Sequence, residues 1–371
     1  MVSFFADMTY EGARSITGPF LALLGASGTI VGVVIGLGEA IGYSFRAVSG
    51  YFTDKTGRYW TIAFIGYLIN MLAVPLLAIA PTWQIASLLI ILERFGKSIR
   101  VPARDAMLSY AAKHTGRGFG FGLHEALDQA GAVSGPLIIS LLLLFNENYR
   151  VGFGVLAIPA VIALLMLNFA RKSYPDPRHL EPQKPNLKGK GLGKTFWIYI
   201  IAVGLVAAGY VDFALIAFHF QKASSVSAVW IPMLYAIAMA VDGIAALAMG
   251  KWFDVRGISV LAVVTGLVAA FAPLVFFGNL TASIIGMILW GIGMGAQETI
   301  MRAIVAHLVP PERRGSAYGI MNMVFGISWA AGSALKGVFY DISIMTLVVF
   351  SVIAQLASIP FFLTLKLKRA T

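Results

Sequence analysis

Apolar runs long enough to cross a lipid bilayer recur along most of this chain, and they restrict its fold more than any other feature. Of its 371 residues, 58% are hydrophobic and only 12% are charged, whereas charged residues make up about 25% of an ordinary soluble domain. Runs such as residues 161–169 are apolar at every position but Asn168 rather than alternating, which favours spanning helices over the strands of a barrel. We therefore expect an all-α integral membrane protein.

Glycine, proline and charged residues divide the apolar sequence into twelve stretches that match the span of a membrane helix, about 20 residues. The expected helices cover residues 2–24, 28–51, 59–80, 84–112, 117–145, 150–170, 196–220, 226–252, 258–278, 281–308, 313–340 and 343–366. A polar segment rich in proline, lysine and glycine separates the sixth from the seventh. The sequence thus predicts a six-helix bundle at residues 1–170, a linker at 171–195 and a second six-helix bundle at 196–371.

The net charge of +11 could suggest a nucleic-acid partner, but the basic residues collect in alternate loops. Those loops hold Lys55, Arg58, Lys113, Arg117, the basic residues of the linker, Lys251, Arg256, Arg313, Arg314, Lys366, Lys368 and Arg369. The opposite loops contribute only Arg150 and Lys222. Basic loops stay on the cytoplasmic side of a membrane. We therefore expect a protein of the cytoplasmic membrane with both termini and the linker in the cytoplasm, and no nucleic-acid partner. The chain has no cysteine, which excludes disulfides and thiol chemistry.

The two halves repeat each other in sequence. GYFTDKTG at 50–57 returns as GKWFDVRG at 250–257, with glycine, aspartate and glycine at the same spacing. GRGFGFG at 116–122 returns as RRGSAYG at 313–319. Parallel six-helix repeats are the architecture of one large class of transporters.

With these motifs, the sequence resembles the major facilitator superfamily over essentially its full length. Residues 50–59 are similar to the family's loop 2–3 signature, and Arg94 stands where its fourth-helix motif has an arginine, with Ser98 in place of the motif glycine. Gly122, Gly131, Gly135 and Pro136 resemble the fifth-helix motif of the proton-antiporter branch, although Ile139 and Ser140 replace its last two glycines.

The resemblance implies twelve helices in two pseudo-symmetric bundles, with a central cavity that opens alternately to each side of the membrane. It also implies a transporter rather than an enzyme. The expected partners are a small-molecule solute, protons and membrane lipids, with no cofactor, and we expect a monomer. No Ser/His/Asp order, metal-ligand spacing or phosphate-binding glycine loop occurs in the polar segments, which disfavours a membrane enzyme or a sensor.

The repeated loops predict a gate that stabilises one access state. Asp54 is expected in the loop after a helix, where it can cap a neighbouring helix, while Lys55 and Arg58 can bind carbonyl ends. The alternative is a simple turn whose charges set topology. The predicted gate residues are Gly50, Asp54, Lys55, Gly57, Arg58, Arg117, Gly250, Asp254 and Gly257.

The fourth predicted helix carries a charged face. Glu93, Lys97, Arg100 and Arg104 follow at i, i+4, i+7 and i+11, and this spacing places them on one side of a helix. A charge at membrane depth costs roughly 2.5–3.5 kcal/mol on insertion scales. This face could attract an anionic solute or hold a proton-binding carboxylate. Alternatively, Arg100 and Arg104 could lie near the cytoplasmic end and bind loops and lipid headgroups.

Acidic residues on the first and fifth helices are the proton-coupling candidates. A desolvated carboxylate beside a like charge binds a proton readily, and histidine titrates near neutrality. The alternatives are an internal Glu11–Arg14 pair and an ordinary hydrogen-bonded histidine. The predicted proton-coupling residues are Asp7, Glu11, His124, Glu125 and Asp128. Gly122, Gly131, Gly135 and Pro136 are better explained by close helix packing and bending.

The remaining interior polar residues are candidates for the wall of a solute cavity. They are Glu39, Arg46, Glu93, Arg94, Lys97, Asp212, Asp242, Gln297, Glu298 and Arg302. Because cations face the acids in the first bundle, we expect a proton-coupled transporter of a small organic solute, anionic or amphipathic. A broad-specificity drug/proton antiporter is the alternative. A divalent metal or metal-chelate transporter that uses Asp7, Glu11, His124 and Asp128 is less favoured, because the nearby arginines and lysine would repel a cation.

Overall fold

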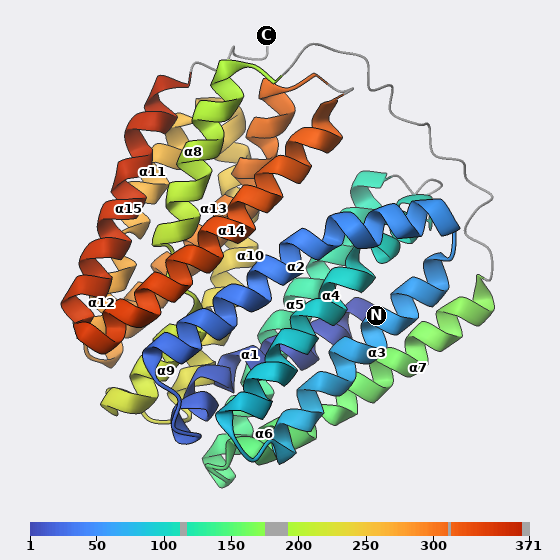
Figure 1. The fold of residues 1–371 in the computed structure, drawn as a ribbon, viewed down its shortest axis with the longest axis vertical. Helices are drawn as coiled ribbons and strands as arrows, with labels where there is room; N and C mark the ends of the chain where they lie inside the picture. Colours follow the sequence, from blue (N-terminus) through green and yellow to red (C-terminus); the bar gives the residue numbers. More distant parts are fainter. Residues whose placement is uncertain (112–116, 175–191, 311–312, 366–371) are drawn as a thin grey trace. The chain divides into compact units, whose positions relative to one another are not determined.

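The computed structural model describes residues 1–111, 117–174, 192–310 and 313–365, and every regular element in these residues is a helix (Figure 1). The first part of the chain forms α1 (Val2–Leu23), α2 (Gly28–Thr56), α3 (Tyr59–Leu76), a short 3-10 turn η1 (Leu77–Ile79), α4 (Trp83–Ala111), α5 (Arg117–Phe145), α6 (Tyr149–Val155) and α7 (Ala157–Ser173). The second part forms α8 (Lys194–Gly209), α9 (Phe213–Ala223), α10 (Trp230–Arg256), α11 (Ser259–Val268), α12 (Phe271–Phe277), α13 (Leu280–Leu308), α14 (Arg314–Ile342) and α15 (Ile344–Thr364).

The prediction of an all-helical chain is confirmed for the residues that the structure describes. Nine helical stretches there are long and apolar enough to cross a membrane. Three of these stretches each contain two α-helices with an interruption between them: α6 with α7, α8 with α9, and α11 with α12. The helices α1, α4 and α14 are not among the nine, and α1 and α4 carry the charged candidates Asp7, Glu11, Glu93, Arg94 and Lys97. The count of twelve spans therefore stays a prediction.

The chain forms two compact units. Unit 1 contains Met1–Ala26, Leu37–Pro182 and Ala217–Ala236, and unit 2 contains Ser27–Gly36, Gln183–Ile216 and Ile237–Thr371. Helix α2 contributes its first residues to unit 2 and the rest to unit 1. The predicted division at residues 171–195 stays a prediction.

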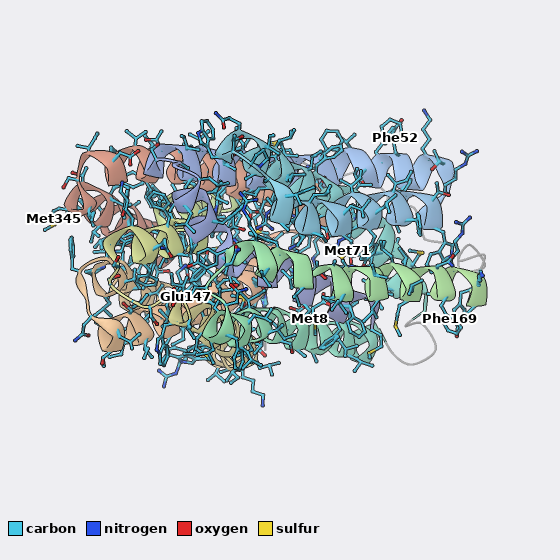
Figure 2. The ribbon with its side chains drawn as sticks, turned by 90° about the horizontal axis from the view of Figure 1, so that it is seen from below. Met8, Phe52, Met71, Glu147, Phe169 and Met345 are labelled. Carbon is cyan, nitrogen blue, oxygen red and sulfur yellow. The ribbon has the colours of Figure 1, made fainter. Side chains whose placement is uncertain are left out.

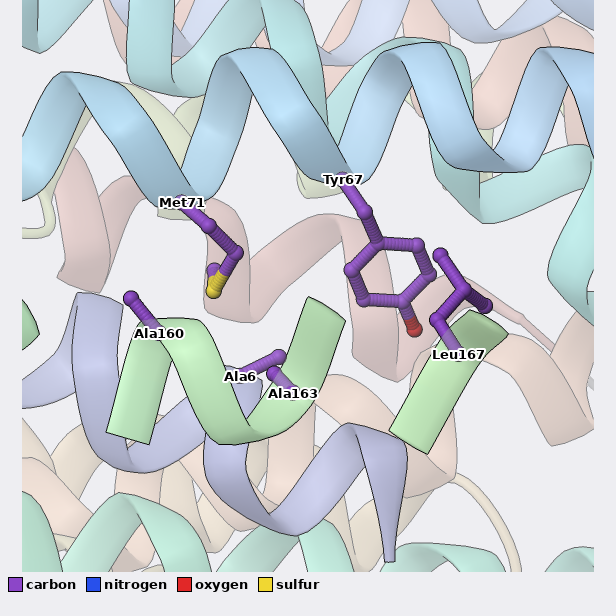
Figure 3. Packing of buried hydrophobic residues seen from close by; sticks show 6 residues of the cluster. All are labelled: Ala6, Tyr67, Met71, Ala160, Ala163 and Leu167. Carbon is purple, nitrogen blue, oxygen red and sulfur yellow. The ribbon is translucent and has the colours of Figure 1, made fainter. Parts of the chain in front are cut away.

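In unit 1, α3 packs along α4, and α1 packs along α5. Where α1, α3 and α7 meet, six side chains form a buried apolar cluster (Figure 3). Its members are Ala6, Tyr67, Met71, Ala160, Ala163 and Leu167. Tyr67 also belongs to the polar site described below, because the guanidinium carbon of Arg100 lies 4.4 Å from its ring centroid. The apolar cluster therefore fixes one wall of that site.

Many large apolar side chains lie on the outside of the described helices. Phe52 and Phe169 project away from the ribbon (Figure 2), with exposed fractions of 54% and 73%. Met345 of unit 2 is exposed in the same way. Soluble monomers rarely leave large apolar patches in contact with water, so this distribution suits helices that contact lipid.

The repeated loops have the same backbone geometry at their final glycine. Helices α2 and α10 end just before Gly57 and Gly257, whose φ angles are +62° and +67°. Glycine favours this left-handed conformation because it has no Cβ. The predicted placement of Asp54 and Asp254 in loops is wrong, because both lie in the last turns of their helices.

In unit 2, the start of α2 is capped by an acidic residue that lies far away in the sequence. Asp341, in the last turn of α14, accepts hydrogen bonds from the backbone N–H of Gly28 at 2.9 Å and of Thr29 at 2.7 Å, and from the Thr29 hydroxyl at 2.7 Å. The first N–H groups of a helix have no partner within the helix. Asp341 therefore supplies acceptors that α2 does not provide for itself.

Replacing Asp341 with alanine should release this end of α2. We expect Asp341→Ala to lower the free energy of unfolding by about 1–2 kcal/mol, the usual effect of losing a helix cap, and to speed amide exchange at Gly28 and Thr29. Thermal unfolding and hydrogen exchange of the purified protein measure both. Glu147→Ala, which removes an exposed acid between α5 and α6, is the control and should change stability by less than about 0.5 kcal/mol. Unaltered exchange at Gly28 and Thr29 would contradict the capping role.

Candidate functional site

Polar side chains from six helices gather inside unit 1. At one end of this network, Asn70 on α3 donates its side-chain amide to the Glu93 carboxylate at 2.7 Å and to the Glu93 carbonyl at 2.9 Å. Arg94 reaches Glu93 at 3.3 Å and Glu39 on α2 at 3.5 Å. Arg14 on α1 approaches the same Glu39 oxygen at 3.6 Å. Glu39 therefore lies between two guanidinium groups.

Glu11 on α1 has its shortest contact with a residue that the sequence analysis did not assign to the site. The Tyr235 hydroxyl on α10 donates to Glu11 Oε2 at 2.5 Å, whereas Arg14 Nη1 lies 4.0 Å from Glu11 Oε1. The expected Glu11–Arg14 pair thus exists only as a long contact. Tyr235 belongs to the part of the chain that packs in unit 1.

At the centre of the network, two cations lie against aromatic rings. The Lys97 ammonium is 3.8 Å from the centroid of the Tyr10 ring. Arg100 is fully buried and contacts the Tyr67 ring, and its nearest carboxylate oxygen is Asp7 Oδ1, at 3.9 Å. The alternative that placed Arg100 among loops and headgroups is therefore wrong.

Arg100 and Asp7 lack the hydrogen bonds that buried charges usually have. Within the described residues, none of the three guanidinium nitrogens of Arg100 has a hydrogen-bond partner, and neither does Asp7 Oδ1. Burying a charge is costly unless it is both paired and hydrogen-bonded. This pair is therefore held by charge attraction and by the aromatic rings rather than by direct hydrogen bonds.

A third group forms around Asp128 on α5. His124 Nδ1 lies 3.1 Å from Asp128 Oδ2, and Arg104 Nη1 lies 3.7 Å from the same oxygen. His124 Nε2 is also 2.9 Å from the Ser3 hydroxyl on α1. Arg104 additionally binds Asp105 at 2.9 Å. Arg104 therefore joins the interior network, which corrects the alternative that assigned it to loops.

Other predicted residues of unit 1 lie outside this network. Glu125 is exposed, and Arg46 stacks on the Tyr43 ring at 4.7 Å. Asp54, Lys55 and Arg58 are exposed, and so is Asp254 in unit 2. In the described part of the chain, neither Asp54 nor Asp254 forms a side-chain hydrogen bond or an ion pair. The gate therefore stays a prediction. The side chain of Arg117 and the surroundings of Gly122 lie outside the described part of the structure.

The glycines of α5 lie where this helix crosses α1. A Cβ atom added to Gly131 would lie 2.3 Å from the carbonyl oxygen of Phe4, and one added to Gly135 would lie 2.2 Å from that of Met8. Only glycine fits so close an approach. Pro136 follows inside the same helix.

The candidates of unit 2 lie on α10, on α13 and between α8 and α9. Asp212 lies between α8 and α9 and accepts a hydrogen bond from the Ala214 N–H at 2.9 Å. Asp242 is buried on α10. On α13, Gln297 donates to the Gly293 carbonyl at 3.1 Å. Further along α13, Glu298 is half-buried and Arg302 is exposed, so Arg302 is not the interior charge that we expected.

No group of three or more His, Cys, Asp or Glu side chains in the described residues is placed to hold a metal ion. Of the four ligands of the metal alternative, His124 and Asp128 contact each other, whereas Asp7 and Glu11 have other partners. Asp7 faces Arg100, Glu11 accepts from Tyr235, and His124 contacts Asp128.

The sequence analysis missed five neutral members of the network: Ser3, Tyr10, Tyr67, Asn70 and Tyr235. Asn70 gave the one usable signal, because an amide in the middle of the apolar run of α3 needs a buried partner. Tyrosines are common in membrane helices, so nothing in the sequence separated Tyr10 and Tyr235 from the other tyrosines.

Comparisons with known proteins agree with this architecture. The sequence profile of the Major Facilitator Superfamily matches residues 2–333. The uncharacterized protein Rv2265 of Mycobacterium tuberculosis is 41% identical over 378 residues, which cover 100% of this chain and 92% of that protein. Multidrug resistance protein MdtH of Proteus mirabilis is 27% identical over 335 residues, or 87% of this chain and 81% of that protein.

Two solved structures share the fold at low sequence identity. The nucleoside transporter NupG superimposes with a TM-score of 0.78 at 16% identity and covers 98% of both chains. The peptide transporter POT in complex with sulfate gives a TM-score of 0.77 at 12% identity, over 98% of this chain and 91% of that chain.

A double-mutant cycle tests the central pair. Asp7→Asn and Arg100→Leu each leave one buried charge without its nearest partner, and such a change typically costs about 3–5 kcal/mol. We expect the double variant to be more stable than the sum of the two effects by about 1–3 kcal/mol, as measured by unfolding of the purified protein. As the control, Asp7→Asn combined with Arg46→Leu should be additive to about 0.5 kcal/mol. Additivity of Asp7→Asn with Arg100→Leu would show that the two side chains do not interact.

Proposed function

This chain belongs to the major facilitator superfamily, and we propose that it couples solute movement to protons by alternating access. It is an integral membrane transporter of a small-molecule solute and not an enzyme. The observation that carries the proposal is the Asp7–Arg100 pair, which is buried inside unit 1 without direct hydrogen bonds. We place the protein in the cytoplasmic membrane with both termini in the cytoplasm, because the basic residues collect in alternate loops.

The geometry of this pair suits reversible protonation. A carboxylate that accepts several hydrogen bonds holds its charge strongly. Asp7 Oδ1 accepts none in the described structure and lies 3.9 Å from Arg100. Protonation of Asp7 therefore breaks no hydrogen bond to this oxygen, and it leaves Arg100 as a buried cation without its partner. That imbalance favours a rearrangement or the binding of another anion.

Asp128 offers a second protonation site. Its Oδ2 atom lies between His124 and Arg104, and His124 also contacts Ser3. A histidine between a hydroxyl and a carboxylate can release a proton from one ring nitrogen while its other ring nitrogen binds a second proton. We assign Asp7 and Asp128 the main proton-binding roles, with His124 as the relay.

The cations and rings beside Asp7 support an anionic or amphipathic organic solute. Lys97 and Arg100 supply positive charge, and Tyr10 and Tyr67 supply aromatic surface next to it. A solute with an acidic group and an apolar body can satisfy both. Protonated Asp7 would leave Arg100 free to contact the acidic group of such a solute.

Transport in proteoliposomes tests proton coupling. Vesicles that contain the protein and a trapped pH indicator are given a panel of aromatic and aliphatic carboxylates, with and without an imposed pH gradient. We expect at least one solute to move protons with it, and Asp7→Asn to reduce gradient-driven flux at least tenfold while exchange of solute without a gradient continues. Glu147→Gln, in an exposed loop, is the control. Solute flux that ignores the gradient would refute proton coupling.

A broad-specificity drug/proton antiporter is the second candidate, and it is favoured by the likeness to proteins named multidrug resistance protein MdtH. The buried cations argue against cationic drugs. An overexpressing strain distinguishes the two proposals: an exporter should raise resistance to several unrelated compounds, and Asp128→Asn should abolish the effect. If the strain gained resistance to none of these compounds while carboxylate flux was linked to protons, only the first proposal would remain. A divalent metal or metal-chelate transporter has the least support, because two of its four expected ligands, Asp7 and Glu11, contact Arg100 and Tyr235 instead.

A further inference from the structure

Helices α8 and α9 share one apolar stretch, Lys194–Ala223, which is interrupted after Gly209. Where a helix ends, its last carbonyl groups lose their partners within the helix. At membrane depth no water can donate hydrogen bonds to these carbonyl groups, so other groups of the protein must donate them. The question is which groups supply the missing hydrogen bonds at this break.

Every carbonyl from Ala208 to Asp212 accepts a hydrogen bond, and side chains provide most of the donors. The Lys336 ammonium donates to the carbonyls of Ala208 at 2.8 Å and Tyr210 at 2.5 Å. The Ser351 hydroxyl donates to Gly209 at 2.7 Å, and the Trp290 indole N–H donates to Val211 at 2.9 Å. The Asp212 carbonyl accepts from the backbone of α9.

Lys336 is the one charged side chain among these donors. It lies on α14 and is fully buried. The Asp212 carboxylate is close enough to attract its ammonium group, and the end of α8 places the negative pole of the helix dipole beside it. Carbonyl oxygens at an unwound break, a helix C-terminus and a nearby carboxylate are the surroundings in which transporters of other folds hold a monovalent cation.

The backbone of the break is fixed independently of Lys336. A Cβ atom added to Gly332 on α14 would lie 2.2 Å from the Ala208 carbonyl oxygen, and one added to Gly209 would lie 2.9 Å from the Ser351 carbonyl oxygen. Helices α14 and α15 therefore clamp the end of α8 from two sides. Removing the lysine side chain should leave the carbonyl oxygens in place around an empty position.

We propose that the Lys336 ammonium acts as a tethered monovalent cation for the carbonyl site between α8 and α9, and that a free alkali-metal or small ammonium ion binds there once the lysine side chain is removed. In the native protein, the break is then stable without any ion from the medium. The proposal stands independently of proton coupling and of the solute.

Thermal unfolding of purified Lys336→Ala in different salts tests the proposal. The salts are sodium, potassium, methylammonium and choline chloride at equal ionic strength, with choline as the cation that is too large for the site. We expect the native protein to unfold at the same temperature in all four. The variant should unfold at a lower temperature in choline, and at least one small cation should raise its midpoint by several degrees, in a saturable manner.

Two matched variants separate a cation site from general salt effects. Lys194→Ala removes the same side chain from the exposed start of α8, and Ser351→Ala removes a neutral donor from the break but keeps Lys336. Neither should respond to the choice of cation. The proposal would be overturned if Lys336→Ala unfolded at the same temperature in all four salts. It would also be overturned if this variant were as stable in choline as the native protein.

If Lys336→Ala does not fold in choline, Lys336→Ser is tested in the same salts, because its hydroxyl can donate to one carbonyl. A variant whose carbonyl site is filled by a small cation is expected to fold. Failure of both variants to fold in every salt would therefore also count against the proposal.

Discussion

Polar groups buried at membrane depth must find their partners within the protein, because lipid offers neither donors nor acceptors. This constraint acts on both units of the chain, but on different groups. In unit 1 the groups are charged side chains of α1, α2, α4 and α5, which contact one another. In unit 2 they are backbone carbonyls at an interrupted helix, which bind side chains of α13, α14 and α15. The contacts in both of these groups follow from this one requirement.

Residue type and spacing were enough to predict the helical class and much of the polar network, and the resemblance of the motifs indicated the family. The face formed by Glu93, Lys97 and Arg100 follows from the geometry of a helix, and the structure indeed directs these residues to the interior. Sequence could not predict which carboxylate meets which cation. That depends on how far each helix is rotated and shifted against its neighbour, and helix boundaries from sequence are uncertain by several residues. The pairing of Arg104 with Asp128 instead of with loops is such a case.

The role of Lys336 was out of reach for a different reason. Its acceptors are backbone carbonyls, and every residue type carries one. A sequence therefore shows where a lysine is, but not that a helix breaks beside it. The break itself has a weak signature, since Tyr210 and Val211 are compatible with a continuing helix. Asp212 supplies the clearest signal, because aspartate before an apolar run favours a helix start.

Two of the buried cations, Lys336 and Arg100, illustrate how a transporter can separate the parts that stay fixed from the parts that move. Lys336 has two hydrogen bonds and a neighbouring carboxylate, on a backbone that glycine contacts hold in place. Rearranging it would leave several groups without partners at once, at a cost of about 1–3 kcal/mol for each. Arg100 has no hydrogen bond in the described structure and only one distant carboxylate. Moving it therefore breaks no hydrogen bond, and protonation of Asp7 removes the charge that holds it in place. A change in protonation should for this reason move the network of unit 1 and leave the break between α8 and α9 as it is.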